Sequence, residues 1–180
     1  MKKKSHLVPK ILFLTGLPSS GKTSLALSLK KEFEKKGFKK IKYIDGDSFR
    51  KKFKLDQYDN KSRNLVGDEK IKFAKSFLKF KKLIIVTGVA HNKSWRKKIK
   101  KKNKNLLEIY TKCPIKVCLL RDYKKNYLKA KNNKIKNFVG INYEYQEGKT
   151  VDLTLDMYKN TLKFNTNKLF KFLIKNRYVY

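Results

Sequence analysis

A glycine-rich segment near the start of the chain constrains the fold more than any other feature. Residues 16–23 read GLPSSGKT, which is the complete G-x-x-x-x-G-K-[ST] pattern of a phosphate-binding loop. The apolar run Ile11–Leu14 comes directly before it. Apolar residues at helical spacing follow it: Leu25, Ala26, Leu29 and Phe33. The sequence therefore predicts a strand, a tight loop and a helix in direct succession.

Each residue type in this loop suits the binding of a phosphate chain. Gly16 and Gly21 allow a tight turn and a close approach of the backbone to a bulky anion. The loop N–H groups then form an anion-binding nest, and the following helix adds its positive end. Lys22 is expected to reach the β- and γ-phosphates, and Thr23 to hold Mg²⁺ through its hydroxyl. The predicted nucleotide-binding residues are Gly16, Leu17, Pro18, Ser19, Ser20, Gly21, Lys22, Thr23 and Ser24.

Apolar runs alternate with amphipathic stretches along the rest of the chain, which is typical of a parallel sheet with crossover helices. The expected strands are 11–15, 41–44, 83–87, 115–120 and 153–155, with 106–110 as a further strand. Helices are expected at 24–36, from 48 to 53, at 65–80, within 89–104, at 123–131 and over 168–175, with 55–62 as a loop. We therefore predict a single α/β domain over residues 1–180, with three layers and a mostly parallel five-stranded sheet.

Two polar segments stand apart from this pattern. Residues 1–9 form a basic N-terminal tail, and residues 132–150 form a polar, glycine-containing loop that is long enough to be a lid. In sheets of this kind, ligands bind beyond the carboxyl ends of the strands. The phosphate-binding loop, Asp45, Asp47 and residues 87–92 are all predicted to lie there.

A net charge of +34 is the most unusual feature of the composition. So basic a chain could bind nucleic acid. However, the charge comes mainly from scattered lysines, and arginine, which reads bases and phosphates better, is rare. We therefore expect a solvated lysine surface and no specific nucleic-acid partner. The alternative is a basic nucleic-acid-binding protein with a vestigial phosphate-binding loop.

The sequence also bears on the location of the protein. No apolar run approaches the roughly 18 residues that a membrane span needs. The basic N-terminal residues lead into a predicted strand and not into a cleavable signal region. Cys113 and Cys118 lack metal-ligand spacing, and two reduced cysteines suit the cytosol. We expect a cytoplasmic protein without a membrane partner.

Two carboxylates follow the second predicted strand, in the sequence Asp45-Gly46-Asp47. One could organise Mg²⁺ through water, and the other could accept a proton from an attacking hydroxyl. A simple turn is the alternative, because Asp and Gly are common turn residues. Asp47 is the preferred base, and Lys22 is expected to stabilise the transferring charge. Three arginines are candidates to clamp an anionic group: Arg50, Arg63 and Arg121.

Three segments together resemble the adenylylsulfate kinase family. They are GLPSSGKT at 16–23, YIDGDSFR at 43–50 and KNFVGI at 136–141. The resemblance covers roughly residues 10–175 and implies a phosphate-loop kinase fold. It also implies transfer of the γ-phosphate of ATP to the 3′-hydroxyl of adenylylsulfate, a step of sulfate assimilation. The resemblance suggests a small nucleotide substrate, ATP and Mg²⁺ as ligands. It also suggests a homodimer.

The resemblance also assigns roles to single residues. Thr23 and Asp45 are expected to serve Mg²⁺, and Asp47 the attacking hydroxyl. Arg121 is expected near the base of ATP. The residues expected to contact the acceptor are Asp47, Arg50, Arg63, Asn64, Lys136, Asn137 and Phe138, with Phe138 stacked on its base.

Two departures from the family pattern fall on the acceptor side. The family's D-R-x-E-N-x-R-R run corresponds to residues 58–67, where only the Arg63-Asn64 pair remains. Ala90 stands where the family often has a serine, which excludes a phosphoserine at this position and leaves direct transfer. A relative that phosphorylates another nucleotide-linked compound, such as a cytidine diphosphate derivative, fits this pattern as an alternative. A nucleotide-binding regulator without turnover is a further one.

Overall fold

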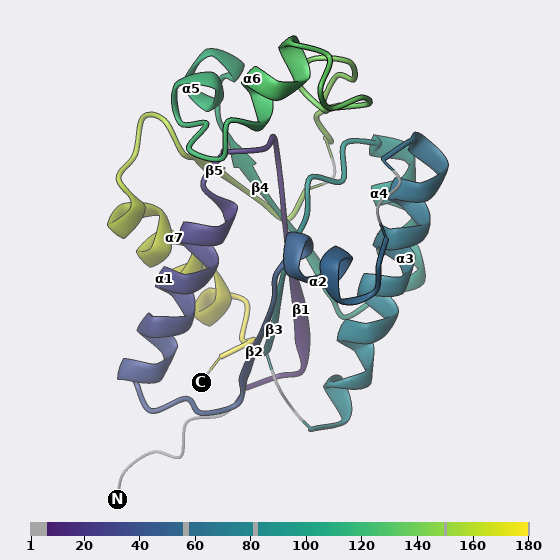
Figure 1. Cartoon of the computed structure of the whole chain (residues 1–180). Coiled ribbons are helices and arrows are strands. Elements are labelled where there is room, and N and C mark those ends of the chain that lie inside the picture. Colours follow the sequence, from purple (N-terminus) through teal and green to yellow (C-terminus); the bar gives the residue numbers. More distant parts are fainter. Residues whose placement is uncertain (1–6, 56–57, 81–82, 150, 180) are drawn as a thin grey trace, which may run out of the picture.

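A parallel sheet forms the centre of the molecule in the computed structural model, which describes residues 7–55, 58–80, 83–149 and 151–179 (Figure 1). Its strands are β1 (Lys10–Thr15), β2 (Ile41–Ile44), β3 (Leu83–Thr87), β4 (Leu106–Lys112) and β5 (Leu153–Asp156). They lie in the order β2-β3-β1-β4-β5, and every pairing is parallel. The central strand β1 thus ends between β3 and β4, and the loop that follows it lies in the middle of the sheet edge.

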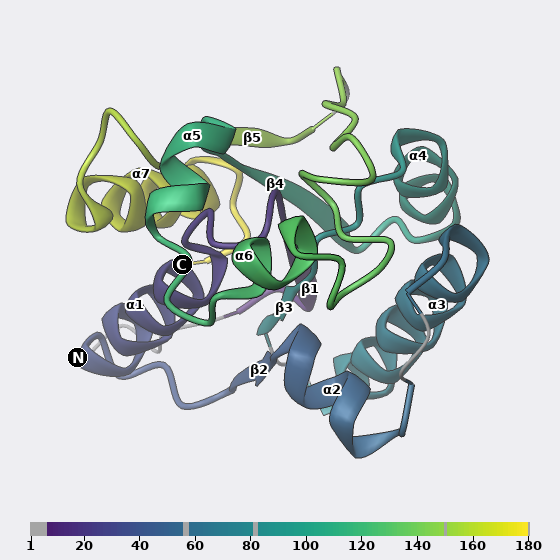
Figure 2. The ribbon, with the colours of Figure 1, turned by 45° about the horizontal axis from the view of Figure 1, so that its top comes forward.

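Helices cover both faces of this sheet (Figure 1). On one face lie α1 (Lys22–Lys35) and α7 (Leu162–Lys175), and on the other lie α3 (Asn60–Ser76) and α4 (Lys93–Lys102). Shorter helices are α2 (Gly46–Lys52), α5 (Ile115–Leu120) and α6 (Asn126–Lys131), with a 3₁₀ turn, η1, at Leu78–Phe80. Figure 2 shows α5 and α6 together over the edge where the strands end.

The alternation of β1 side chains explains the three layers. Leu12 and Leu14 pack into the core under α1 and α7, whereas Ile11 and Phe13 pack into the core under α3 and α4. Successive residues of a strand point to opposite faces, so a continuous apolar run requires cover on both sides. The predicted three-layer α/β fold is confirmed, with every strand pairing parallel.

One predicted strand is wrong. Residues 115–120 form the helix α5, and the N–H of Cys118 donates to the carbonyl of Pro114 at 3.1 Å. Ile115 and Leu120 are 36% and 87% exposed, so this apolar run does not supply a buried strand. β4, predicted over 106–110, takes the place beside β1. The prediction failed because a short run of β-branched and apolar residues is compatible with either a helix or a strand.

A second difference concerns the start of α3. The structure begins this helix at Asn60, whereas the sequence analysis placed residues 55–62 in a loop. The side chain of Asp59 accepts a hydrogen bond from the N–H of Ser62 at 3.0 Å and caps the helix. Asp at an N-cap satisfies an N–H group that has no partner within the helix. Some predicted segments lie partly outside the described residues. These are residues 1–6 of the predicted tail, residues 56–57 of the predicted loop, and position 150 of the proposed lid.

A buried ion pair connects α4 to β4. Nε of Arg96 donates to Oε1 of Glu108 at 2.6 Å, and both side chains are almost fully buried. The same guanidinium donates to the carbonyls of Ala90 and Gln146, each at 2.6 Å. It also lies over the ring of Tyr145, 4.9 Å from the centroid. The pair thereby holds the segment before α4 and the segment around residue 146 against the sheet.

Removal of one partner of this pair is expected to cost much stability. Arg96→Met leaves the carboxylate of Glu108 buried without a counter-charge, which should lower the free energy of unfolding by about 3–5 kcal/mol. Urea denaturation measures this loss. Lys97→Met on the exposed face of α4 is the matched control, and adding Glu108→Leu to Arg96→Met should recover much of the loss. Wild-type stability of the single variant would contradict this account.

Candidate phosphate-transfer site

The phosphate-binding loop connects β1 to α1 in a strained conformation. Gly16 has φ 144°, Ser19 has φ 59° and Gly21 has φ 93°, all in the region that favours glycine. A Cβ atom at Gly16 would lie 2.4 Å from Oγ1 of Thr111 on β4, so no larger residue fits there. Ser20 is fully buried, and its hydroxyl pairs with that of Thr111 at 2.8 Å. The neighbouring strand therefore fixes the shape of the loop.

The ammonium of Lys22 points into this loop. Nζ donates to the carbonyls of Gly16, at 3.1 Å, and Leu17, and lies 3.3 Å from Oγ of Ser20. Burial lowers the pKa of Lys22 to about 8. Anionic phosphate oxygens at this position would favour the charged form, because an opposite charge stabilises a buried ammonium.

Thr23 and Asp45 meet at the hydroxyl of Tyr43. That hydroxyl donates to Oδ2 of Asp45 at 2.9 Å and also interacts with the side chain of Thr23. Burial opposes ionisation of Asp45, but hydrogen bonds from Ser48 and Tyr43 outweigh it and lower the pKa of this carboxyl. An ionised carboxylate and a hydroxyl beside a phosphate-binding loop fit Mg²⁺, which takes few protein ligands and keeps waters and phosphate oxygens.

Asp47 lies in the first turn of α2, just beyond β2. Asp45 caps this helix by accepting a hydrogen bond from the N–H of Ser48 at 2.9 Å. The cap fixes the direction of the first turn. Asp47 lines the same cavity as Lys22, and its Oδ2 accepts a hydrogen bond from Nζ of Lys124 at 2.8 Å. Its side chain is largely exposed. A carboxylate in this position can reach an acceptor hydroxyl next to the phosphate chain.

The expected acceptor residues come from α2, from α3 and from the segment after α6. Nη2 of Arg63 donates to the carbonyl of Asn137 at 2.7 Å, and its Nε donates to the carbonyl of Tyr58 at 2.7 Å. Phe138 is buried and lies edge-on to the ring of Tyr127, with the centroids 4.9 Å apart. The guanidinium of Arg50 lies over the ring of Tyr58, 4.4 Å from its centroid.

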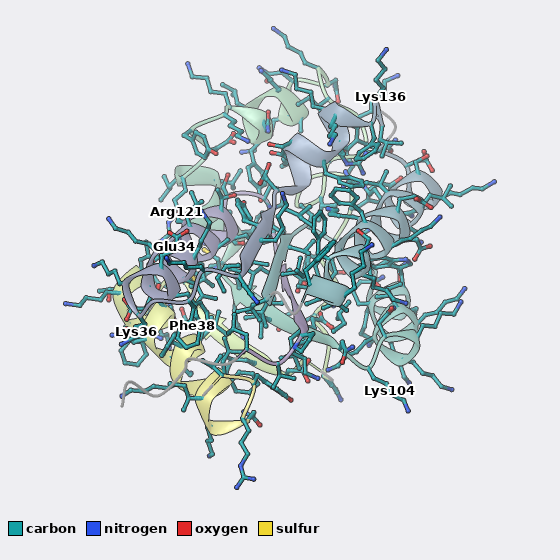
Figure 3. The ribbon with its side chains drawn as sticks, turned by 90° about the horizontal axis from the view of Figure 1, so that it is seen from below. Glu34, Lys36, Phe38, Lys104, Arg121 and Lys136 are labelled. Carbon is teal, nitrogen blue, oxygen red and sulfur yellow. The ribbon has the colours of Figure 1, made fainter. Side chains whose placement is uncertain are left out.

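Two cavities collect most of the predicted site residues. The larger, of about 800 Å³, contains these predicted residues: Pro18, Ser19, Gly21, Lys22, Thr23, Ser24, Asp45, Asp47, Arg63, Arg121 and Phe138. The smaller, of about 90 Å³, adds Arg50 and Asn64. Outside both linings lie Gly16, Leu17, Ser20, Lys136 and Asn137. Lys136 is exposed, and its side chain extends away from the ribbon in Figure 3.

The sequence analysis assigned no role to several residues at this site. Tyr43 and Thr87 donate to the carboxylate of Asp45, and Lys124 pairs with Asp47. Of these residues, Thr87 belongs to the segment 87–92, which the sequence analysis did predict at this edge of the sheet. The segment after β5 also lines the larger cavity. In this segment, the carbonyl of Met157 accepts a hydrogen bond from Nη1 of Arg121 at 3.0 Å. The strand position of Tyr43, two residues before Asp45, is the one signal that the sequence offered for it. The others come from distant parts of the chain.

The fold and the site define an α/β phosphotransferase of the phosphate-loop kinase class. A family model described as adenylylsulphate kinase matches residues 8–156. The chain belongs to this family. It is an ATP-dependent kinase with a hydroxyl acceptor, and the family that the sequence analysis suggested is confirmed.

Relatives with different acceptors have similar sequences. An adenylyl-sulfate kinase of Thermodesulfovibrio yellowstonii is 33% identical over 152 residues, which covers 81% of this chain and 74% of the relative. A cytidine diphosphoramidate kinase of Campylobacter jejuni is 32% identical over 167 residues, which covers 93% of this chain and 95% of the relative. The APS kinase of Mycobacterium tuberculosis, solved with AMPPNP and APS, has a TM-score of 0.85 at 24% identity over 94% of this chain and 99% of that one.

Proposed function

We propose that this kinase transfers the γ-phosphate of ATP to the 3′-hydroxyl of adenylylsulfate and forms 3′-phosphoadenylylsulfate. The observation that carries the proposal is the continuity of the larger cavity. It joins Lys22 and Thr23 to Asp47 and to Phe138 within one space of about 800 Å³. A triphosphate on the loop and an alcohol beside Asp47 therefore share one chamber, as in-line transfer requires.

On the donor side, the loop N–H groups and Lys22 bind the β- and γ-phosphates. Thr23 and Asp45 hold Mg²⁺, which neutralises charge on the phosphate oxygens when bound. Arg121, whose guanidinium donates to the carbonyl of Met157 in the segment after β5, contacts the base of ATP. Lys22 keeps its charge opposite the transferring group, which is where negative charge develops.

On the acceptor side, Asp47 accepts the proton of the attacking hydroxyl. Arg50, Arg63 and Asn64 contact the anionic part of the acceptor, and Lys136 and Asn137 flank its site. Phe138 stacks on its base, a contact worth about 1–3 kcal/mol by analogy with other base–aromatic pairs. Ala90 has no hydroxyl to carry a phosphate, so the transfer is direct.

A cytidine diphosphate derivative is the second candidate acceptor. The observation that favours it is the altered segment 58–67, where Arg63 donates to the carbonyls of Tyr58 and Asn137. The Campylobacter jejuni cytidine diphosphoramidate kinase matches nearly the whole chain at 32% identity. Both candidate reactions use ATP and the same ATP-binding residues. They differ only in the acceptor and in the residues that bind it.

An acceptor assay separates the two. With ATP and Mg²⁺ present, kcat/KM for adenylylsulfate should exceed that for cytidine diphosphoramidate by about 100-fold or more, because a site built for one set of polar groups rejects another strongly. ADP release measured by a coupled assay gives both constants, and the Lys22→Ala variant supplies the background. A reversed preference identifies the second candidate. Turnover of neither compound by the wild type would overturn the proposed acceptor class.

Three further properties stay predictions: a homodimer, a cytoplasmic location and the lack of a specific nucleic-acid partner. Among the described residues, no helix is both long enough and apolar enough to cross a membrane. Figure 3 shows Lys36, Lys104 and Lys136 on separate sides of the molecule, which agrees with a dispersed basic surface. Sedimentation of the purified protein measures the assembly directly.

A further inference from the structure

A lysine occupies the core-facing side of α3. The buried residues of this helix are Val66, Gly67, Lys70, Ile71 and Ala74. Lys70 is 6% exposed. A lysine at such a position is costly, because burial of an ammonium removes its hydration. Lysine is almost never fully buried without a paired charge. Its position therefore needs an explanation beyond packing.

The ammonium of Lys70 reaches the edge of the sheet where β2 and β3 end. Nζ donates to the carbonyl of Thr87 at 3.1 Å. A Cβ atom at Gly46 or at Gly88 would lie 3.1 Å from Nζ, so the two glycines make room for it. Within the described part of the chain, this is its one hydrogen bond, and no carboxylate forms a salt bridge with it. An ammonium has three donors, so two remain for another partner.

Positive charge predominates around this ammonium. The smaller cavity is lined by Lys70, Arg50 and Arg63, and by Asp47 as the one carboxylate among its described lining residues. Burial and, after it, the charge of Arg50 lower the pKa of Lys70 to about 8, against the opposing effect of Asp47 and Asp45. Arg50 likewise lowers the pKa of Arg63, after burial. Arg50 thus repels both Lys70 and Arg63, and an anion that lies among these three cations would stabilise them.

We propose that Lys70 is a further acceptor-binding residue, which completes with Arg50 and Arg63 a subsite for the anionic end of the acceptor. The acceptor class that fits is a nucleotide whose 5′-phosphate carries a second anionic group, either a sulfate or a phosphoryl group. The inference rests on the proposed kinase function but holds for both candidate acceptors, because each has this chemistry.

The residues around the cavity supply the geometry of binding. Asp47 lines both cavities, so the anion subsite opens onto the place where the acceptor hydroxyl is expected. An acceptor with its sugar at Asp47 therefore directs its phosphate toward α3. Lys70 then donates its two remaining N–H groups to the anion while the third stays on Thr87.

Kinetics of Lys70→Met test this role, with Lys72→Met on the exposed face of the same helix as the control. The acceptor KM of Lys70→Met should rise about 10- to 100-fold, since a hydrogen bond to a charged group has an effect of this order. kcat and the KM for ATP should stay within about threefold of wild type. Lys72→Met should match the wild type throughout. A kcat loss without a KM change, or equal behaviour of the two variants, overturns the proposal.

The uncharged nucleoside distinguishes anion binding from support of the pocket shape. Adenosine, measured as an inhibitor competitive with adenylylsulfate, should bind Lys70→Met and wild type within about twofold, because it lacks the anion. Equal weakening of adenosine and adenylylsulfate would assign Lys70 a structural role and overturn the proposal.

Calorimetry without ATP measures acceptor binding separately from phosphoryl transfer. Wild type should bind adenylylsulfate more tightly than adenosine, and Lys70→Met should lose most of this difference. This result supports the anion subsite even if phosphoryl transfer is absent, in which case the proposed function alone fails. An unchanged difference in Lys70→Met overturns the subsite, and so does a wild type that prefers neither adenylylsulfate to adenosine nor cytidine diphosphoramidate to cytidine. A thermal melt confirms that Lys70→Met is folded.

Discussion

Lys22→Ala is expected to abolish phosphoryl transfer while the fold survives. We expect kcat to fall by about 10³-fold or more, the range seen when a residue that stabilises the transition-state charge is removed. The Lys22 ammonium lies inside the phosphate-binding loop and has no role in the apolar cores. Its loss removes charge from the place where the γ-phosphate transfers, without opening a cavity in the core.

The measurement is ADP release at saturating ATP and acceptor, with circular dichroism to verify the fold. Lys31→Ala on the exposed face of α1 is the matched control and should retain wild-type turnover. Near-normal turnover of Lys22→Ala would remove the assignment of the loop as the catalytic phosphate site. Loss of the folded state in Lys22→Ala alone would instead show that this lysine is structural.

Asp47→Asn is expected to have the second largest effect, a fall in kcat of about 10²- to 10⁴-fold. The amide is similar in size to the carboxylate but cannot accept the proton of the attacking hydroxyl. The largely exposed side chain contributes little to packing, so the stability of the protein should stay close to that of the wild type. Single-turnover kinetics with bound ATP isolate the chemical step from product release.

The ion pair of Asp47 with Lys124 requires its own control. Nζ of Lys124 lies 2.8 Å from Oδ2 of Asp47, so Asp47→Asn also weakens this contact. Lys124→Met breaks the same pair but leaves the carboxylate in place. If Asp47 acts on the acceptor hydroxyl, Lys124→Met should reduce kcat far less than Asp47→Asn. Equal losses of kcat in the two variants would show that Asp47 acts only as the ion-pair partner of Lys124.

The phosphate-binding loop was predictable because its residues are contiguous in the sequence. The strand, loop and helix at residues 11–35 follow from local pattern, and the strand end at Asp45 follows from the next apolar run. Local chemistry determines this part: Gly16 and Gly21 adopt positive φ angles at little cost, and the first turn of α1 supplies N–H donors. The three-layer arrangement then follows from strands that are apolar on both faces.

The acceptor half was harder to predict because distant segments build it. Lys70 is one lysine among many in the sequence, and only the packing of α3 on β3 shows that it is buried. Residues 115–120 are apolar enough for a strand, yet β4 already occupies the position next to β1. Neither the register of a helix against a sheet nor competition between neighbouring runs can be read from local pattern.

The hydrogen bond from Arg63 to the carbonyl of Asn137 joins two segments that are far apart in the sequence. An attempt to redesign the acceptor preference by transplanting residues 58–67 from a relative would therefore strip residue 137 of its donor. A chimera of this kinase and a relative should therefore take residues 58–67 and the segment around residue 137 from the same parent.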